Sequence, residues 1–250
     1  KPLSGYSDKE LATVIGVVLT EKCELRNMTV EELVGMGRSP YTGFWGRLGK
    51  RDKEVINDAI QLVNIEHLRY QMVHQLSDGE RQKAMIAKAL AQETDIIFLD
   101  EPTAFLDFPS KVEIMQLLHR LSHTGNRTIF LSTHDLELAL QIADKVWLMN
   151  KEHGVKTGTP EDLSLDGSLS HFFLRKGIKF DMESGLFRIA KQATVFVRLI
   201  GEGYRYTMVQ KALARQGIDG NRQHDSDWYI EVSDTSYLLH HADGQTEQTA

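Results

Sequence analysis

Two adjacent carboxylates stand directly after an apolar segment of the chain. Asp100 and Glu101 close the run DIIFLDE, which reads as a buried strand, and Pro102 ends that strand at once. In open α/β sheets, ligands bind at the carboxyl ends of the strands. Neighbouring strand residues point to opposite faces, so one carboxylate can hold Mg²⁺ while the other polarises a water molecule. The alternative is a solvated acidic strand end without a ligand.

A histidine follows a second apolar segment. His134 comes directly after residues 127–133, which predict a strand, and a helix is expected beyond it. In a phosphate site, a histidine at this place can sense charge near the γ-phosphate and orient the attacking water. Alternatively, His134 is a bystander beside a helix cap that Ser132, Thr133 or Asp135 provides.

The segment QLSDGERQ, residues 75–82, combines a helix cap with a glycine. Ser77 precedes Glu80 by three positions and an alanine-rich run follows, so the pair predicts a capping box in which each residue satisfies a backbone N–H group. A cap alone does not require Gly79. A glycine lets a ligand approach the backbone, and the N-terminus of a helix suits a phosphate. The segment is therefore either only a cap or also half of a nucleotide site.

Composition excludes several classes of protein. The 250 residues carry a formal net charge of −6, which argues against a nucleic-acid partner, whose binding surface should be basic. Cys23 is the single cysteine, so no disulfide can form within the chain. No apolar run is long enough for a membrane span and no signal peptide is visible, so any work at a membrane would be as a peripheral subunit. The chain begins at Lys1, and we expect it to be a piece of a longer protein.

The elements that must position these residues fall into two regions. Residues 13–19 predict a buried strand, and a second capping box at Thr29 and Glu32 opens a short helix that ends at a glycine. Residues 51–65 have apolar residues at helical spacing, so about 21–92 should be mostly helical. From 95 to 150, apolar strands alternate with helices, which indicates α/β architecture with a parallel sheet covered by helices.

The last third of the chain changes in character. Residues 166–193 read as a linker, and 194–250 as a small α+β domain with strands at 194–201, 227–232 and 236–242. The polar tail from residue 243 is expected to fray. His240 and His241 are adjacent on a predicted strand and point to opposite faces, so they are poor partners for one metal ion.

Taken together, the three segments resemble the motifs of the ATP-binding cassette (ABC) family and its transporter nucleotide-binding subunits. Residues 76–80 are similar to the signature motif of that family. Residues 96–100 are similar to its Walker B strand, with Glu101 as the catalytic glutamate. Residues 104–107 resemble the D-loop, which ends at Asp107, and His134 resembles the switch histidine.

The resemblance implies a fold and a set of cofactors. The fold would be a partial P-loop NTPase-type (ABC) parallel sheet with a helical subdomain, over about residues 1–165, and the cofactors would be ATP and Mg²⁺. Asp100 would hold the metal. The protein would be an ATP hydrolase, and no nucleic acid would be involved.

The resemblance also answers the question raised by the cap. In this family two nucleotide-binding domains sandwich ATP, so we expect a homodimer. Ser77 and Gly79 of one domain would face the γ-phosphate held by the other. Asp78 stands where a second glycine is commoner, and Glu80 completes the segment.

Two departures from the family pattern matter. The sequence has no G-x-x-x-x-G-K-[ST] segment, the loop that cradles phosphates, so we expect this chain alone to bind Mg-ATP weakly or not at all and to be inactive. Thr20 stands at the Q-loop position, where the family has glutamine. Either the coupling differs, or Glu21 substitutes, or the register is shifted by one.

Within the family, residues 29–48 resemble importers for iron–siderophore, haem and vitamin B12 compounds, on the strength of Val34, Gly37, Arg38, Pro40 and Tyr41. The expected function is therefore transport-coupled ATP hydrolysis at the cytoplasmic face of the cell membrane, with membrane-spanning permease subunits as partners. The alternatives are a degenerate, non-catalytic cassette and an ABC ATPase outside transport.

The same segment offers aromatic residues for a docking site. In such importers the helical subdomain receives a helix of the membrane subunit. Tyr41, Phe44 and Trp45 could anchor that helix, or they could instead pack the core of the subdomain itself.

Overall fold

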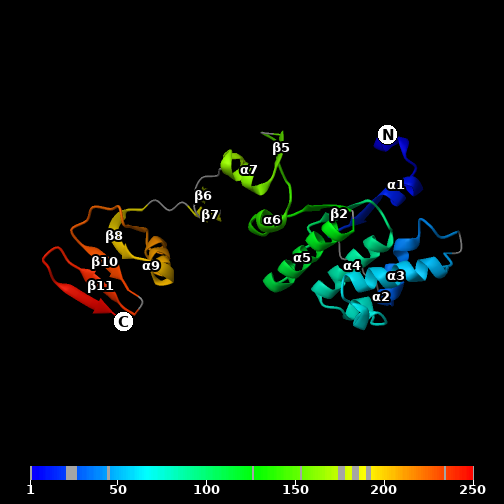
Figure 1. The fold of residues 1–250 in the computed structure, drawn as a ribbon, viewed down its shortest axis with the longest axis horizontal. Helices are drawn as coiled ribbons and strands as arrows, with labels where there is room; N and C mark the ends of the chain where they lie inside the picture. Colours follow the sequence, from blue (N-terminus) through cyan, green and yellow to red (C-terminus); the bar gives the residue numbers. More distant parts are fainter. Residues whose placement is uncertain are drawn as a thin grey trace. The chain divides into compact units, whose positions relative to one another are not determined.

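The computed structural model describes residues 2–20, 27–43, 46–125, 127–152, 154–173, 178–181, 186–189, 193–233 and 235–249. The chain divides into one unit over Lys1–Leu163 and another over Ser164–Ala250, and each is described here by itself. Figure 1 shows the elements of both units. None of the helices in the described ranges combines the length and apolar character needed to cross a bilayer.

A parallel sheet of three strands organises the first unit. The strands β1 (Ile15–Val18), β2 (Ile96–Asp100) and β3 (Thr128–Ser132) lie in the order β1-β2-β3. Their register pairs Val18 with Leu99 and Asp100 with Ser132, so the carboxyl ends of all three strands meet at one edge. The predicted α/β architecture with a parallel sheet is confirmed.

The first strand is shorter than the sequence predicts. Residues 13 and 14 belong to α1 (Asp8–Val14), which a capping box between Ser7 and Glu10 starts. The box nucleates a helix that continues through the β-branched residues Thr13 and Val14 before the chain extends. Local capping has therefore overridden strand propensity here.

Helices make up much of the described chain between β1 and β2, where the sequence predicts a mostly helical region. The capping boxes at Thr29 and Glu32 and at Ser77 and Glu80 are both formed. The elements are α2 (Val30–Gly35), η2 (Met36–Arg38), α3 (Lys50–Leu62), η3 (Glu66–Leu68), η4 (Val73–Gln75) and α4 (Asp78–Ala91).

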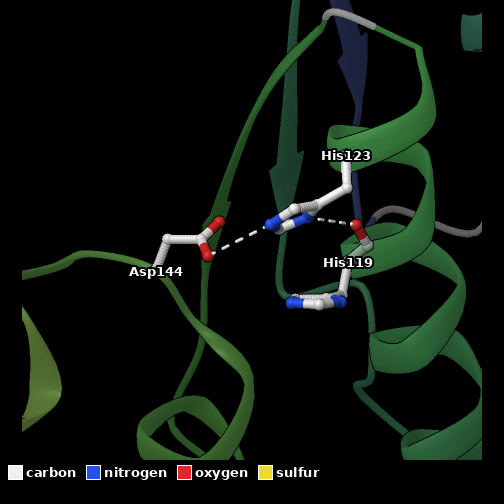
Figure 2. Close-up of side chains that lie close together, drawn as sticks. All are labelled: His119, His123 and Asp144. Carbon is white, nitrogen blue, oxygen red and sulfur yellow. Dashed lines mark hydrogen bonds and ion pairs between the residues drawn. The ribbon is translucent and has the colours of Figure 1, made fainter.

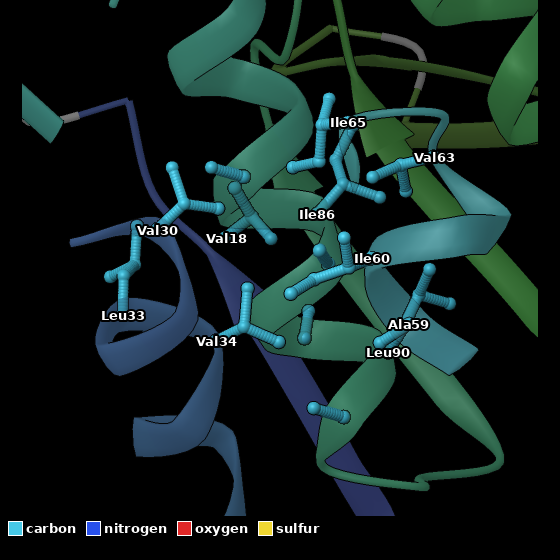
Figure 3. Packing of buried hydrophobic residues seen from close by; sticks show 14 of the residues in the cluster. Val18, Val30, Leu33, Val34, Ala59, Ile60, Val63, Ile65, Ile86 and Leu90 are labelled. Atoms are coloured by element: carbon cyan, nitrogen blue, oxygen red, sulfur yellow. The ribbon is translucent and has the colours of Figure 1, made fainter. Parts of the chain in front are cut away.

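The core of this unit lies where α2, α3 and α4 meet β1, as Figure 3 shows. Val34, Ile60 and Ile86 are almost fully buried there. Burial of each of these side chains stabilises the fold by about 1.5–3 kcal/mol relative to leaving it exposed. The approach of η2 to α4 is closer still. A Cβ on Gly37 would lie 2.2 Å from the backbone oxygen of Lys88, so only glycine fits at this position.

One strand departs from the predicted parallel sheet. The strand β4 (Val146–Asn150) was expected to join it, but it pairs antiparallel with β5 (Gly154–Gly158). The two segments are close in the sequence, so an antiparallel pair can form between them locally, and β4 uses its backbone groups in that pair. The strand β4 contacts the parallel sheet through a side chain instead. The Trp147 ring meets the Phe130 ring of β3 edge-on, with 4.9 Å between the centroids.

Two further helices flank the sheet residues. Helix α5 (Phe108–Thr124) follows β2, and α6 (Leu136–Ile142) follows β3. Asp107 caps α5 and Asp135 caps α6. Both helices therefore begin close to the carboxyl edge of the sheet.

Residues 166–193, predicted as a linker, contain regular structure. After α7 (Pro160–Leu165) come α8 (Ser168–Phe173) and an antiparallel pair, β6 (Ile178–Asp181) and β7 (Leu186–Ile189). The ring of Phe187 lies 5.3 Å from that of Phe173 and 4.9 Å from that of Phe180. These aromatic contacts hold the small hairpin to α8.

The remaining strands form a mixed sheet. Its order is β12-β11-β10-β8-β9, with β8 parallel to both its neighbours and a helix, α9, between β8 and β9 in the chain. The elements are β8 (Val195–Gly201), α9 (Gly203–Arg215), β9 (Ile218–Asn221), β10 (Tyr229–Val232), β11 (Tyr237–His240) and β12 (Thr246–Thr249).

The prediction of a frayed tail is wrong. Residues 246–249 pair antiparallel with β11, with Thr246 opposite His240. The turn between them includes Gly244 at φ 84°, a conformation that glycine adopts without steric cost. Backbone pairing with a neighbouring strand outweighs the polar composition of this segment.

Candidate functional site

The carboxylate of Asp100 is fixed between the ends of two neighbouring strands. The Thr20 hydroxyl, just beyond β1, lies 2.6 Å from the backbone oxygen of Asp100 and 3.1 Å from its Oδ2. Ser132 Oγ, at the end of β3, donates to Oδ1 of Asp100 at 2.7 Å. Hydroxyls on both sides therefore hold the carboxylate in one orientation at the edge of the sheet.

Ser132 has a role that sequence reasoning missed. It was considered only as a cap for the helix after it, but Asp135 provides that cap through Oδ1 and the N–H of Leu138, at 3.4 Å. Ser132 Oγ instead accepts from the backbone N–H of Glu101 at 2.9 Å. The available signal was its position as the last residue of a strand that neighbours the strand of Asp100.

Glu101 and His134 are brought together. His134 Nε2 lies 2.7 Å from Glu101 Oε1, in a contact that requires a proton on Nε2. The His134 side chain is 89% exposed and that of Glu101 is 37% exposed, so the pair is open to ligands. Such a pair can take up a proton from a bound water molecule and hold it between two side chains.

The backbone of Glu101 is in the left-handed region, with φ 44°. A residue with a Cβ adopts this conformation only where its surroundings hold it there. Here the Ser132 hydroxyl holds the N–H, and the N–H of Ala104 donates to the carbonyl oxygen at 2.9 Å. This turn directs Glu101 away from the line of the strand and toward His134.

The donor set at this edge fits a hard cation. Asp100 offers carboxylate oxygens, and Thr20 and Ser132 add hydroxyl oxygens. Mg²⁺ prefers oxygen ligands and is typically held by one or two carboxylates together with phosphates. The residues present therefore suit Mg²⁺ together with a phosphate ligand.

The segment at the start of α4 is a formed cap. Ser77 Oγ accepts from the N–H of Glu80 at 3.3 Å, and Glu80 Oε2 accepts from the Ser77 N–H at 2.9 Å. The backbone and hydroxyl hydrogen bonds from Ser77 hold the pKa of Glu80 below its ordinary value. Asp78 lies 3.6 Å from the guanidinium of Arg81.

Gly79 is not required by the packing of the chain. A Cβ at this position would meet only the Ser110 side chain, at an ordinary 3.5 Å. The same contact places the segment beside the first turn of α5, where Asp107 Oδ1 accepts from the N–H of Ser110 at 3.1 Å. Hydrogen bonds from the side chain and backbone of Ser110 hold the pKa of Asp107 below its ordinary value.

The predicted site residues thus form two groups. One is at the sheet edge, where Asp100 and Glu101 lie with Thr20 and His134, and where Ser132 joins them. The other consists of residues 77–80 at the start of α4 and Asp107 at the start of α5. The hydrogen bonds described above for these residues stay within each of the two helix starts.

Other predicted residues have more ordinary surroundings. Tyr41 is 43% exposed, but its hydroxyl donates to the Gln92 backbone oxygen at 2.9 Å and its ring lies under the Arg38 guanidinium at 4.1 Å. Part of its surface therefore packs its own subdomain. Glu21, Phe44 and Trp45 lie outside the described residues.

The two C-terminal histidines contact different carboxylates. His240 stacks on Tyr229 and lies 3.3 Å from Glu231, whereas His241 lies 3.6 Å from Glu247. The structure therefore gives these adjacent histidines separate carboxylate partners.

Two family models match the chain. The model described as ABC transporter matches residues 1–104, and the model described as iron ABC transporter C-terminal domain matches residues 194–250. Both agree with the resemblance seen in the motifs.

Similar curated proteins are ATP-binding subunits. An ABC transporter ATP-binding protein of Methanocaldococcus jannaschii is 40% identical over 76% of this chain and 65% of its own length. The petrobactin import protein FpuC of Bacillus anthracis is 37% identical over 64% of this chain and 57% of its own. The ferric enterobactin transport protein FepC of Escherichia coli is 37% identical over 63% of this chain and 58% of its own length. The chain therefore spans less than two thirds of these relatives.

Solved structures share the fold. An inward-facing ABC transporter assigned to the metal-chelate type is 29% identical, with a TM-score of 0.61 over 71% of this chain and 72% of its own. A dimeric bacterial ABC transporter cassette is 25% identical, with a TM-score of 0.51 over 62% of this chain and 68% of its own.

Proposed function

The chain belongs to the ABC transporter family of ATP-binding proteins, and from this premise we propose that it acts in transport-coupled ATP hydrolysis for the import of iron compounds. The observation that carries the catalytic part is the arrangement of Asp100, Glu101 and His134 at one edge of a parallel sheet. The match of residues 194–250 to an iron transporter domain and the siderophore-related names of the relatives support the cargo class.

We assign roles from the geometry. Asp100 would hold Mg²⁺ through its carboxylate, which Thr20 and Ser132 orient. Glu101 accepts the proton of the attacking water, and His134 holds the carboxylate of Glu101 in place. Mg-ATP, when bound, would supply the phosphoryl group, and its metal would offset charge on the phosphate oxygens.

The start of α4 is proposed to act across a dimer. Ser77 and Gly79 are open at the N-terminus of a helix, where a phosphate is favoured, and the fold itself does not need the glycine. A second copy would hold the nucleotide that this segment contacts. Similarity to a dimeric cassette supports this homodimer.

Cargo recognition would lie elsewhere. Membrane-spanning permease subunits are the proposed partners, and the protein would sit peripherally at the cytoplasmic face of the membrane. The exposed part of Tyr41 is a proposed element of the permease contact.

Tight ATP binding requires more phosphate donors than this sequence provides. It contains no G-x-x-x-x-G-K-[ST] segment, whose N–H groups and lysine normally hold the β- and γ-phosphates. Titration of Mg-ATP into the 250-residue chain should therefore give no binding at micromolar concentrations. Micromolar binding would mean that phosphate is held in some other way.

Hydrolysis is tested with the protein expressed from the complete gene. Glu101→Gln should lower turnover by at least ~100-fold, because the proton acceptor is lost, and should trap an ATP-bound dimer detectable by size-exclusion chromatography. Glu137→Gln, an exposed position in the first turn of α6, is the matched control and should hydrolyse ATP like the wild type. Equal, near-zero turnover in all three proteins would favour a non-catalytic cassette.

A further inference from the structure

A second group of side chains with metal-binding chemistry lies on α5, separate from the sheet edge. We propose that His119, His123 and Asp144 form a site for a divalent transition metal of the zinc class. One ligand atom from each residue lies within 4.8 Å of those of the other two. Figure 2 shows the two imidazoles on one face of α5 and Asp144 facing them from the segment between α6 and β4.

The spacing of the histidines presents both rings to one ion. Residues i and i+4 lie on the same face of a helix, one turn apart. The two ring centroids are 4.3 Å apart and the planes differ by 33°. A pair of histidines at this spacing on a helix is the arrangement that supplies two zinc ligands in other proteins.

The hydrogen bonds of His123 leave Nε2 as the ring nitrogen that can bind a metal ion. Its Nδ1 lies 2.9 Å from the backbone oxygen of His119, an acceptor, so Nδ1 carries the proton. When the ring is neutral the lone pair is on Nε2, which faces Asp144 Oδ1 at 3.4 Å, and a bound metal ion would take the place of the proton that joins these two atoms in an ion pair. Metal-binding histidines typically donate their other ring N–H to a carbonyl or carboxylate, which fixes the tautomer and the ring orientation.

The ligand set favours particular ions. Two imidazole nitrogens and one carboxylate oxygen suit Zn²⁺ and similar transition metals, whereas Mg²⁺ and Ca²⁺ prefer oxygen ligands alone. Bonds of about 2.0–2.1 Å at tetrahedral angles place ligand atoms roughly 3.3 Å apart. The three side chains are exposed, so rotation about their χ angles can close this difference. A fourth position remains for water.

Occupancy would connect two segments of the first unit. Asp107 caps the start of α5, and α6, which follows His134, leads to Asp144. A metal bound by the three residues would fasten the C-terminal part of α5 to the connection after α6. It should therefore raise the thermal stability of this unit.

The test is a calorimetric titration of ZnCl₂ into the full 250-residue chain, with ATP absent. His119→Gln, His123→Gln and Asp144→Asn should each weaken one equivalent of binding by at least ~10-fold. His74→Gln and Asp58→Asn are matched controls at exposed positions outside the group, and both should bind as the wild type does. Any zinc that binds elsewhere on the chain should bind equally to the wild type and to all the variants.

Melting temperatures with Zn²⁺ and with EDTA provide a second readout. Zn²⁺ should raise the melting temperature of the wild type and both controls, and should do so much less in the three ligand variants. All variants should melt alike in EDTA, because the substituted side chains are exposed. Unchanged affinity and unchanged Zn²⁺ response in the ligand variants would overturn the proposal, and would leave His123 and Asp144 as an ion pair only. If zinc binding is lost in the two histidine variants but kept in Asp144→Asn, Asp144 is not a ligand.

Discussion

His134 Nε2 lies 2.7 Å from Oε1 of Glu101, although the two residues follow different strands of the sheet. Glu101 makes this contact with its backbone in the left-handed region, at φ 44°. Ser132, at that end, contacts both the N–H of Glu101 and the carboxylate of Asp100. One hydroxyl thus aligns the two acidic residues.

Removal of the Ser132 hydroxyl should lower ATP turnover clearly but reduce the stability of the fold only slightly. In Ser132→Ala, Oδ1 of Asp100 and the N–H of Glu101 lose a partner, at a stability cost of about 1 kcal/mol because both are near solvent. ATP turnover by the protein from the complete gene should fall at least ~10-fold, since misplaced catalytic groups lose rate steeply. Thr128→Ala, at the exposed opposite end of β3, should leave turnover intact. Wild-type turnover in Ser132→Ala would mean that this hydroxyl does not position the acids.

The two functions assigned to Ser77 can be separated by substitution. Ser77→Ala should destabilise the chain by about 1 kcal/mol through loss of the cap, and Ser77→Asn should restore stability because asparagine also caps helices. If Ser77 also contacts nucleotide across a dimer, both variants should lower ATPase turnover. Thr29→Ala removes the equivalent cap of α2 and should lose similar stability but keep turnover. Wild-type turnover in Ser77→Asn would leave the segment as a cap only.

Gly37 should tolerate no side chain. Gly37→Ala would place a Cβ against the Lys88 backbone oxygen and separate η2 from α4, which we expect to cost about 2–3 kcal/mol. Gly43→Ala is the control, because a Cβ there meets nothing within 4 Å. Urea denaturation of both variants measures the difference in free energy of unfolding, and equal midpoints would contradict the close packing.

Arg38 should be a major contributor to the stability of the helical region. Its buried guanidinium bonds Asp52 at 2.9 Å, Glu93 at 2.8 Å and the Ala91 backbone oxygen at 2.7 Å. Arg38→Met would leave these acceptors without their donor, and we expect a loss of about 3–5 kcal/mol. Arg51→Met breaks an exposed pair with the same Glu93 and should cost less than about 1 kcal/mol. Chemical denaturation distinguishes the two, and similar losses would show that burial does not govern this network.

Local features of the molecule were predictable from the sequence, and non-local ones were not. The capping boxes at Thr29 and Ser77 depend on residues three positions apart, and the sheet edge follows from where apolar strands end. The partner of β4 and the pairing of β12 depend on which backbone is nearest in space, which apolar pattern alone does not specify. For the same reason Ser132 was overlooked, because its contact with Asp100 is set by strand register.

Acid should destabilise the first unit through its hydrogen-bonded carboxylates. The pKa of Glu32 is lowered by the N–H and hydroxyl of Thr29, and that of Glu80 by the same groups of Ser77. Arg38 chiefly lowers the pKa of Asp52, with help from the Gly49 N–H.

A carboxylate with a lower pKa in the folded state binds fewer protons there than in the unfolded state, so its contribution is present above the unfolded value and is lost as pH falls. Unfolding free energy should therefore be steady near pH 6–7 and should decline below about pH 4.5. Urea titrations across pH 3–7 measure this. The double variant Glu32→Gln/Glu80→Gln should be less stable at pH 7 and lose less on acidification, and an unchanged slope would show that these caps do not govern the acid response.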